Sequence, residues 1–83
     1  MKYNGLYEDE ISELITEHEE TNYTIAHNGI KYRPVTWAFY EDGITWRPVD
    51  MFYYYPSANN RYFIGKRDIV NLLAHEEFSI NAI

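Results

Sequence analysis

The stretch GIKYRPVTWAFY, residues Gly29–Tyr40, returns fourteen residues later as GITWRPVDMFYY, residues Gly43–Tyr54. Six of the twelve positions are identical, and two more exchange one aromatic residue for another. Two copies with so short a period cannot build a solenoid. The period instead equals one strand plus one turn. The repeat therefore predicts two adjacent, pseudo-equivalent strands at the centre of a small sheet.

Turn residues beside each copy predict antiparallel hairpins. Asn28-Gly29 lies between β-prone runs and fits a type I′ turn, in which both central residues take positive φ. Asp42-Gly43 supplies the second turn, as a two-residue turn or a bulged three-residue loop, and residues 56–60 supply the third. We expect positive φ at both Gly29 and Gly43.

Each copy also carries a proline, which cannot donate a ladder hydrogen bond and is excluded from central strands. If the two copies pair around a turn centred on Asp42, Pro34 lies near Asp50 and residue 36 lies near Pro48. Extending the first hairpin places Pro34 opposite Tyr23, where the first strand begins. Pro48 lies beyond the reach of the short last strand. Each proline is therefore expected where its strand has lost one neighbour.

Amphipathic segments flank the predicted sheet on both sides. The apolar residues Ile11, Leu14 and Ile15 recur at the spacing of one helix face, which predicts an acidic helix from about Tyr7 to Glu20. A second segment, starting after Gly65, has the same period and predicts a helix that ends near Glu77. The expected fold class is α+β: an N-terminal helix, a four-stranded antiparallel β-meander and a C-terminal helix packed on the sheet.

Length and composition further limit the domain organisation and the cellular compartment that we expect. Its 83 residues predict a single domain, 1–83, with 46% hydrophobic and 18% aromatic residues. The absence of cysteine rules out disulfides and favours a reducing compartment. No apolar run fits a signal peptide or a transmembrane segment, so we expect a soluble cytoplasmic protein without a membrane partner.

The net charge of −6 is distributed unevenly. The first 22 residues hold seven acidic residues against Lys2 alone, whereas acids and bases balance from Tyr23 onward. Between Asn28 and Arg67 the balance is positive, with six bases against three acids. The sequence therefore predicts an electrostatically polarised molecule.

Nothing in the sequence indicates catalysis. The three histidines, His18, His27 and His75, lie far apart in the chain, and no glycine-rich phosphate loop is present. The carboxylates are expected on an exposed helix face, where general-acid chemistry is unfavourable. We therefore expect no enzyme, no cofactor and no metal site.

Two surfaces are candidates for binding a partner. A row of helical carboxylates can imitate a line of phosphates and occupy the basic groove of a nucleic-acid-handling protein. Duplicated Arg-Pro steps beside aromatic residues can present guanidinium groups on the sheet. Either feature could also be purely structural: a solvated helix face, and a repeated solution to a strand edge. The candidate partner-binding residues are Glu8, Asp9, Glu10, Glu13, Glu17, Glu20, Arg33, Arg47, Tyr53 and Tyr55.

In size, acidity, aromatic content and lack of catalytic residues, the chain resembles small phage-encoded inhibitors of the anti-restriction DNA-mimic and anti-CRISPR type. These groups share no common fold, so the resemblance implies a partner class but no residue roles. The leading hypothesis is a non-enzymatic inhibitor of a basic nucleic-acid-binding or defence protein in a host cytoplasm. One alternative is a nucleic-acid-binding module that uses the arginine and aromatic residues of the sheet. Another is a viral structural or assembly protein, and a homodimer is left open.

Overall fold

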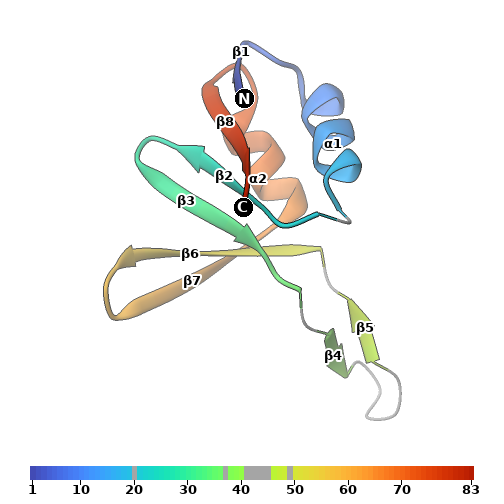
Figure 1. The fold of residues 1–83 in the computed structure, drawn as a ribbon, viewed down its shortest axis with the longest axis vertical. Coiled ribbons are helices and arrows are strands. Elements are labelled where there is room, and N and C mark those ends of the chain that lie inside the picture. Colours follow the sequence, from blue (N-terminus) through green and yellow to red (C-terminus); the bar gives the residue numbers. More distant parts are fainter. Residues whose placement is uncertain (20, 37, 41–45, 49) are drawn as a thin grey trace.

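The computed structural model describes residues 1–19, 21–36, 38–40, 46–48 and 50–83, with the backbone alone for 38–40 and 46–48. It has an α+β fold (Figure 1), as predicted. The elements in chain order are β1 (Lys2–Asn4), α1 (Glu8–Glu17), β2 (Tyr23–His27), β3 (Ile30–Pro34), β4 (Ala38–Tyr40), β5 (Trp46–Pro48), β6 (Met51–Ser57), β7 (Asn60–Gly65), α2 (Lys66–Leu73) and β8 (Glu77–Ala82).

The main sheet has six strands in the order β1-β8-β2-β3-β6-β7, and every neighbouring pair is antiparallel. Strands β4 and β5 form a separate two-stranded sheet. The expected four-stranded meander corresponds to β2, β3, β6 and β7. The prediction of four strands is wrong because β8 and β1 extend the sheet beyond β2.

The second helix is shorter than predicted, and this is why β8 was not foreseen. It ends at Leu73 rather than near Glu77, because His75 adopts a left-handed conformation with φ of 61°. The His75 amide then donates to the Leu6 carbonyl at 2.9 Å. The following residues alternate between buried Phe78 and Ile80 and more polar neighbours, as a half-buried strand does.

The first hairpin matches its prediction. Asn28 and Gly29 have φ values of 49° and 79°, and they connect the paired residues His27 and Ile30. Both central residues therefore have the positive φ that a type I′ turn requires. The equivalent prediction for Gly43 concerns a residue outside the described part of the chain.

The two copies of the repeat pair with each other. Arg33 lies opposite Tyr53 in the β3–β6 ladder, and Phe39 lies opposite Arg47 in the β4–β5 ladder. Between the two ladders, the Val35 amide donates to the Met51 carbonyl at 2.9 Å and continues the same register. The copies thus form one long ribbon, divided into two pieces instead of two unbroken strands.

The register of this ribbon differs from the predicted one. Pro34 lies opposite Phe52 rather than near Asp50, and Pro48 lies opposite Ala38 rather than residue 36. The pairing is therefore centred on residue 43 instead of Asp42. The connecting residues 41–45 lie outside the described part of the chain.

The placement of the prolines agrees with the prediction despite the shifted register. The β2–β3 ladder covers residues from Ile25↔Tyr32 to the turn, so Pro34 has its ladder partner only in β6. Pro48 belongs to the two-stranded sheet and pairs with β4 alone. Each proline therefore sits where a missing N–H group costs no second ladder bond.

Both helices lie against the same face of the sheet, over its β8–β2 half (Figure 1). The β6–β7 hairpin and the β4–β5 pair extend away from the helices. The core cluster consists of Ile11, Ile15, Tyr23, Ile25, Tyr32, Phe52, Ile69, Val70, Leu73, Phe78 and Ile80. Neither described helix is long and apolar enough to cross a bilayer.

Candidate functional site

Helix α1 presents its acidic residues to solvent, as predicted. Ile11 and Ile15 are fully buried against the core, and Leu14 packs at its margin. The predicted binding residues of this helix are all exposed: Glu8, Asp9, Glu10, Glu13 and Glu17. The helix ends at Glu17, earlier than expected, and Glu20 lies outside the described residues.

The carboxylates at the two ends of α1 have different local roles. At the N-terminus, Glu10 Oε1 accepts a hydrogen bond from the Tyr7 amide at 3.1 Å and Asp9 Oδ1 accepts one from the Glu10 amide at 3.0 Å. These contacts cap the helix and complement its dipole. Glu17 lies in the last turn, where negative charge opposes the dipole and no basic residue compensates. Within the described part of the chain, neither Glu13 nor Glu17 forms an ion pair with Lys or Arg.

A shallow cleft of about 270 Å³ runs between β1 and α1. Its lining residues are Tyr3, Leu6, Glu10, Glu13, Leu14 and Glu17. The apolar members are half-buried and the three glutamates are exposed, so the cleft has an apolar floor and a rim of carboxylates. The Tyr3 ring stacks on Phe78, with centroids 5.4 Å apart, which fixes one wall.

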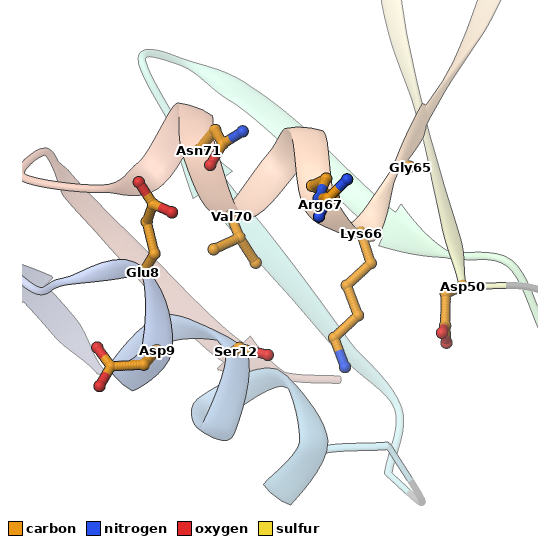
Figure 2. Close-up of a pocket in the computed structure, with 9 residues that line it drawn as sticks. All are labelled: Glu8, Asp9, Ser12, Asp50, Gly65, Lys66, Arg67, Val70 and Asn71. Carbon is orange, nitrogen blue, oxygen red and sulfur yellow. The ribbon is translucent and has the colours of Figure 1, made fainter.

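A second, wider groove of about 700 Å³ separates α1 from the start of α2 (Figure 2). Glu8 and Asp9 line it together with Lys66 and Arg67 of α2. Lys66 extends toward α1, where its Nζ donates to Thr16 Oγ1 at 3.3 Å. Because cations share this groove, Glu8 and Asp9 lie in mixed charge, whereas Glu10, Glu13 and Glu17 form a purely acidic rim.

The face of the sheet opposite the helices carries three of the other candidate residues, Arg33, Tyr53 and Tyr55. Arg33, Tyr53 and Phe63 are directly opposite one another on β3, β6 and β7. Arg61 lies over the Tyr53 and Phe63 rings, at 5.9 and 5.2 Å from their centroids. Tyr55 meets Tyr53 edge-to-face at 6.2 Å. The structure thus brings Arg33, Tyr53 and Tyr55 onto one surface.

Arg47 is not placed with Arg33. It belongs to β5 of the separate two-stranded sheet, and its side chain lies outside the described part of the chain. That the duplicated Arg-Pro steps both present their guanidinium groups on the sheet therefore stays a prediction for Arg47. Two members of the sheet surface, Lys31 and Phe63, were not singled out from the sequence. Their i, i+2 spacing from Arg33 and Arg61 is the signal that could have identified them.

Buried titratable groups lie on the helix side of the sheet. Burial raises the pKa of the Tyr23 hydroxyl to about 12, with a smaller contribution from the charge of Glu19. Burial also raises the pKa of Tyr32, to which the neighbouring Tyr54 adds. His27 is buried, with Nε2 3.4 Å from Glu76 Oε1. These groups lie within the packed layer and contribute to the core.

No family model matches the chain, and neither curated proteins nor solved structures show a significant match to it. Its function must therefore be inferred from its own surfaces. The described residues include no group of three or more histidines and acids placed to hold a metal ion. Within the described part of the chain, the acidic cleft beside α1 and the arginine- and aromatic-rich sheet face each offer a distinct binding chemistry.

Proposed function

We propose that this protein is a non-catalytic inhibitor that binds a basic, nucleic-acid-handling protein through the acidic face of α1. The observation that carries the proposal is the cleft between β1 and α1, with its apolar floor and rim of three glutamates. An arginine or lysine from a partner matches both parts. Its aliphatic stem covers the apolar floor, and its charged head meets the carboxylates.

The position of the rim on a helix supports binding of a basic groove. Glu10, Glu13 and Glu17 are three and four residues apart, so they follow one another along the axis at about 4.5 and 6 Å. This row of negative charge is held by a helix whose other face is anchored in the core by Ile11 and Ile15. A preformed row loses little conformational freedom on binding.

Inhibition follows from competition. Basic side chains that contact phosphates in a nucleic-acid-binding protein are the same groups that fit this cleft. When they are occupied by carboxylates, the nucleic acid is excluded. The net charge of −6 also attracts a basic partner over long range and raises the association rate.

The proposal is tested by affinity capture from nuclease-treated host lysate with matched charge variants. The bait is compared with Glu13→Lys/Glu17→Lys and with a control, Asp68→Lys/Glu77→Lys, which changes net charge equally on α2 and β8. We expect the wild type and the control to retain one basic protein and the α1 variant to lose it. The captured protein is then purified, and its binding to nucleic acid should fall as wild-type inhibitor is added.

A direct probe removes the dependence on an unknown partner. A short arginine-rich peptide should shift the amide NMR signals of Leu6 and Leu14 in the wild type but not in the Glu13→Lys/Glu17→Lys variant. Equal capture by both charge variants, or no shift at Leu6 and Leu14, would contradict the proposal. Capture that disappears after nuclease treatment would show that the protein was held through nucleic acid.

A further inference from the structure

The sheet has a second surface that the proposed function does not use. The open face is defined here as the side of β3, β6 and β7 that points away from the helices. Its members are Lys31, Arg33, Tyr53, Tyr55, Arg61 and Phe63. They alternate along the strands with Tyr32, Phe52 and Tyr54, which pack into or against the core. Neither described helix covers the open face, because α1 and α2 both pack on the other side.

The open face is cationic. Lys31, Arg33 and Arg61 are exposed on it. The described residues of β2, β3, β6 and β7 include no Asp or Glu at all. No carboxylate of these four strands therefore lies beside Lys31 and Arg33, whereas Lys66 and Arg67 share their groove with acids.

Aromatic rings lie between these cations. The side chains of Tyr55 and Phe63 are 52% and 44% exposed, which is high for rings of this size in a sheet. Tyr53 lies between Arg33 and Phe63 in the same cross-strand row. Since adjacent strands are about 4.8 Å apart, this row of cation and rings spans about 10 Å.

We propose that the open face binds single-stranded nucleic acid. Bases stack on Phe63 and Tyr55, while Arg33 and Lys31 contact the phosphates. Rings that interleave with cations fit this ligand because every base offers an aromatic face and every nucleotide a negative charge. A duplex satisfies only the cations, since its bases are already stacked inside, and an acidic peptide likewise leaves the rings unused.

The acidic helix does not prevent this binding. Helix α1 packs on the opposite side of the sheet, and its carboxylates point outward from there. A helix is about 10 Å across, and the Debye length at physiological ionic strength is about 8 Å. Repulsion between the α1 carboxylates and a strand on the open face is therefore screened at working salt concentrations. The inference is independent of the proposed function, since the two surfaces share no residue.

The test is fluorescence anisotropy with a labelled 20-nucleotide single strand, as DNA and as RNA, and a duplex of the same length. We expect the single strands to bind more tightly than the duplex. Phe63→Ala should weaken binding by about 5- to 150-fold, the loss expected for one stacked base. The matched control is Tyr62→Ala on the same strand, because Tyr62 is 54% exposed but faces the other side and should leave affinity unchanged.

The phosphate contacts are tested with a second pair. Arg33→Ala should weaken binding and lower the slope of log affinity against log salt by about 0.7, as one lost phosphate contact does for a single strand. Arg67→Ala makes the same charge change on α2 and should preserve the slope. Arg33→Lys should keep the slope as well, because it retains the charge.

The folded state is checked for each variant by thermal melting, and Phe63→Trp supplies a variant that keeps a stacking ring. Retained affinity in Phe63→Trp with loss in Phe63→Ala supports stacking. The proposal is overturned if duplex and single strand bind equally, if Tyr62→Ala is as damaging as Phe63→Ala, or if no binding is measured at 50 mM salt. Self-association through the open face in place of oligonucleotide binding would overturn it too.

Discussion

The half of the sheet under the helices and the β6–β7 hairpin are parts of one antiparallel sheet, yet they expose their side chains very differently. In the covered half, Ile25 and Ile80 are 0% and 4% exposed. In the hairpin, Tyr62 and Phe63 are 54% and 44% exposed. The two helices are too short to cover six strands, so the covered half supplies stability and the hairpin supplies surface.

The residue types match this division. Aliphatic side chains predominate between the helices and the covered half of the sheet, where Tyr23 and Phe78 are the aromatic members that β2 and β8 contribute. In the hairpin, tyrosines pack on one another, with Tyr54 4.9 Å from Tyr32 and 5.9 Å from Tyr62 between ring centroids. A tyrosine ring is amphipathic and tolerates a half-exposed position that would be unfavourable for isoleucine.

Core truncation should give the largest difference between the two halves. Ile25→Ala removes a fully buried side chain under both helices and is expected to lower the free energy of unfolding by about 2–5 kcal/mol. Phe63→Ala in the hairpin should lower the free energy of unfolding by only about 1 kcal/mol, because nearly half of that ring is already in water. Urea denaturation of the two variants measures both values. Equal costs would mean that the hairpin belongs to the same cooperative core.

The turn that joins β2 to β3 should give the next largest effect. Gly29→Val places a β-branched residue at φ of 79° and is expected to cost more than about 1 kcal/mol. The control is Gly65→Ala, where φ is −72° and an added Cβ would meet Met51 and Asp68 at an ordinary 3.9 Å. The free energy of unfolding of that variant should stay within about 0.5 kcal/mol of the wild-type value. An unchanged free energy of unfolding in Gly29→Val would contradict the type I′ turn.

Alkaline pH should act on the covered half through Tyr23. Its pKa is raised from the ordinary tyrosine value of 10.0 to about 12 in the folded protein, so the folded state favours the neutral hydroxyl. This contribution to stability is complete below pH 10 and is lost as the pH rises through about 12. Thermal melting at pH 9 to 12 should show a decline that is shallower in Tyr23→Phe. An identical decline in both proteins would exclude Tyr23 as its cause.

The smallest stability effect is expected for charge reversal on α1. Glu13→Lys/Glu17→Lys should change the free energy of unfolding by less than about 0.5 kcal/mol, because both side chains are exposed. Weaker repulsion between like charges could even stabilise the helix slightly. Binding of the basic partner should nevertheless fall by at least about tenfold, which corresponds to 1.4 kcal/mol. A large loss of stability would instead identify the two glutamates as structural.

The parts of the fold that follow from local chemistry could be predicted from the sequence. Asn28-Gly29 specifies its turn, and the spacing of Ile11 and Ile15 specifies the buried face of α1. The outcome is harder to foresee where two patterns compete. The segment after α2 continues an apolar helical period, and only the left-handed His75 ends it and starts β8. The register between the two repeat copies likewise depends on the connection through residues 41–45. Turn propensities alone do not distinguish a two-residue turn from a bulged three-residue loop there.

The candidate site shows the same limit. Exposure of the α1 carboxylates follows from helical period, and this prediction is confirmed. The cleft does not follow from the helical period. Tyr3 and Leu6 precede the helix in the chain and approach it only when β1 pairs with β8. Spacing along β7 puts Phe63 on the same strand face as Arg61, but its place beside Tyr53 and Arg33 depends on the order of three strands.

The ribbon formed by the two repeat copies has an internal symmetry. Arg33 opposite Tyr53 and Arg47 opposite Phe39 are the same pair with the copies exchanged, so the pairing register is symmetric about the level of Thr36 and Asp50. A strand with this property is complementary to its own duplicate. When such a segment is duplicated in tandem, the duplicate can pair with the original as the second strand of a hairpin. A sheet can therefore grow by one hairpin without a change in any strand that was already present.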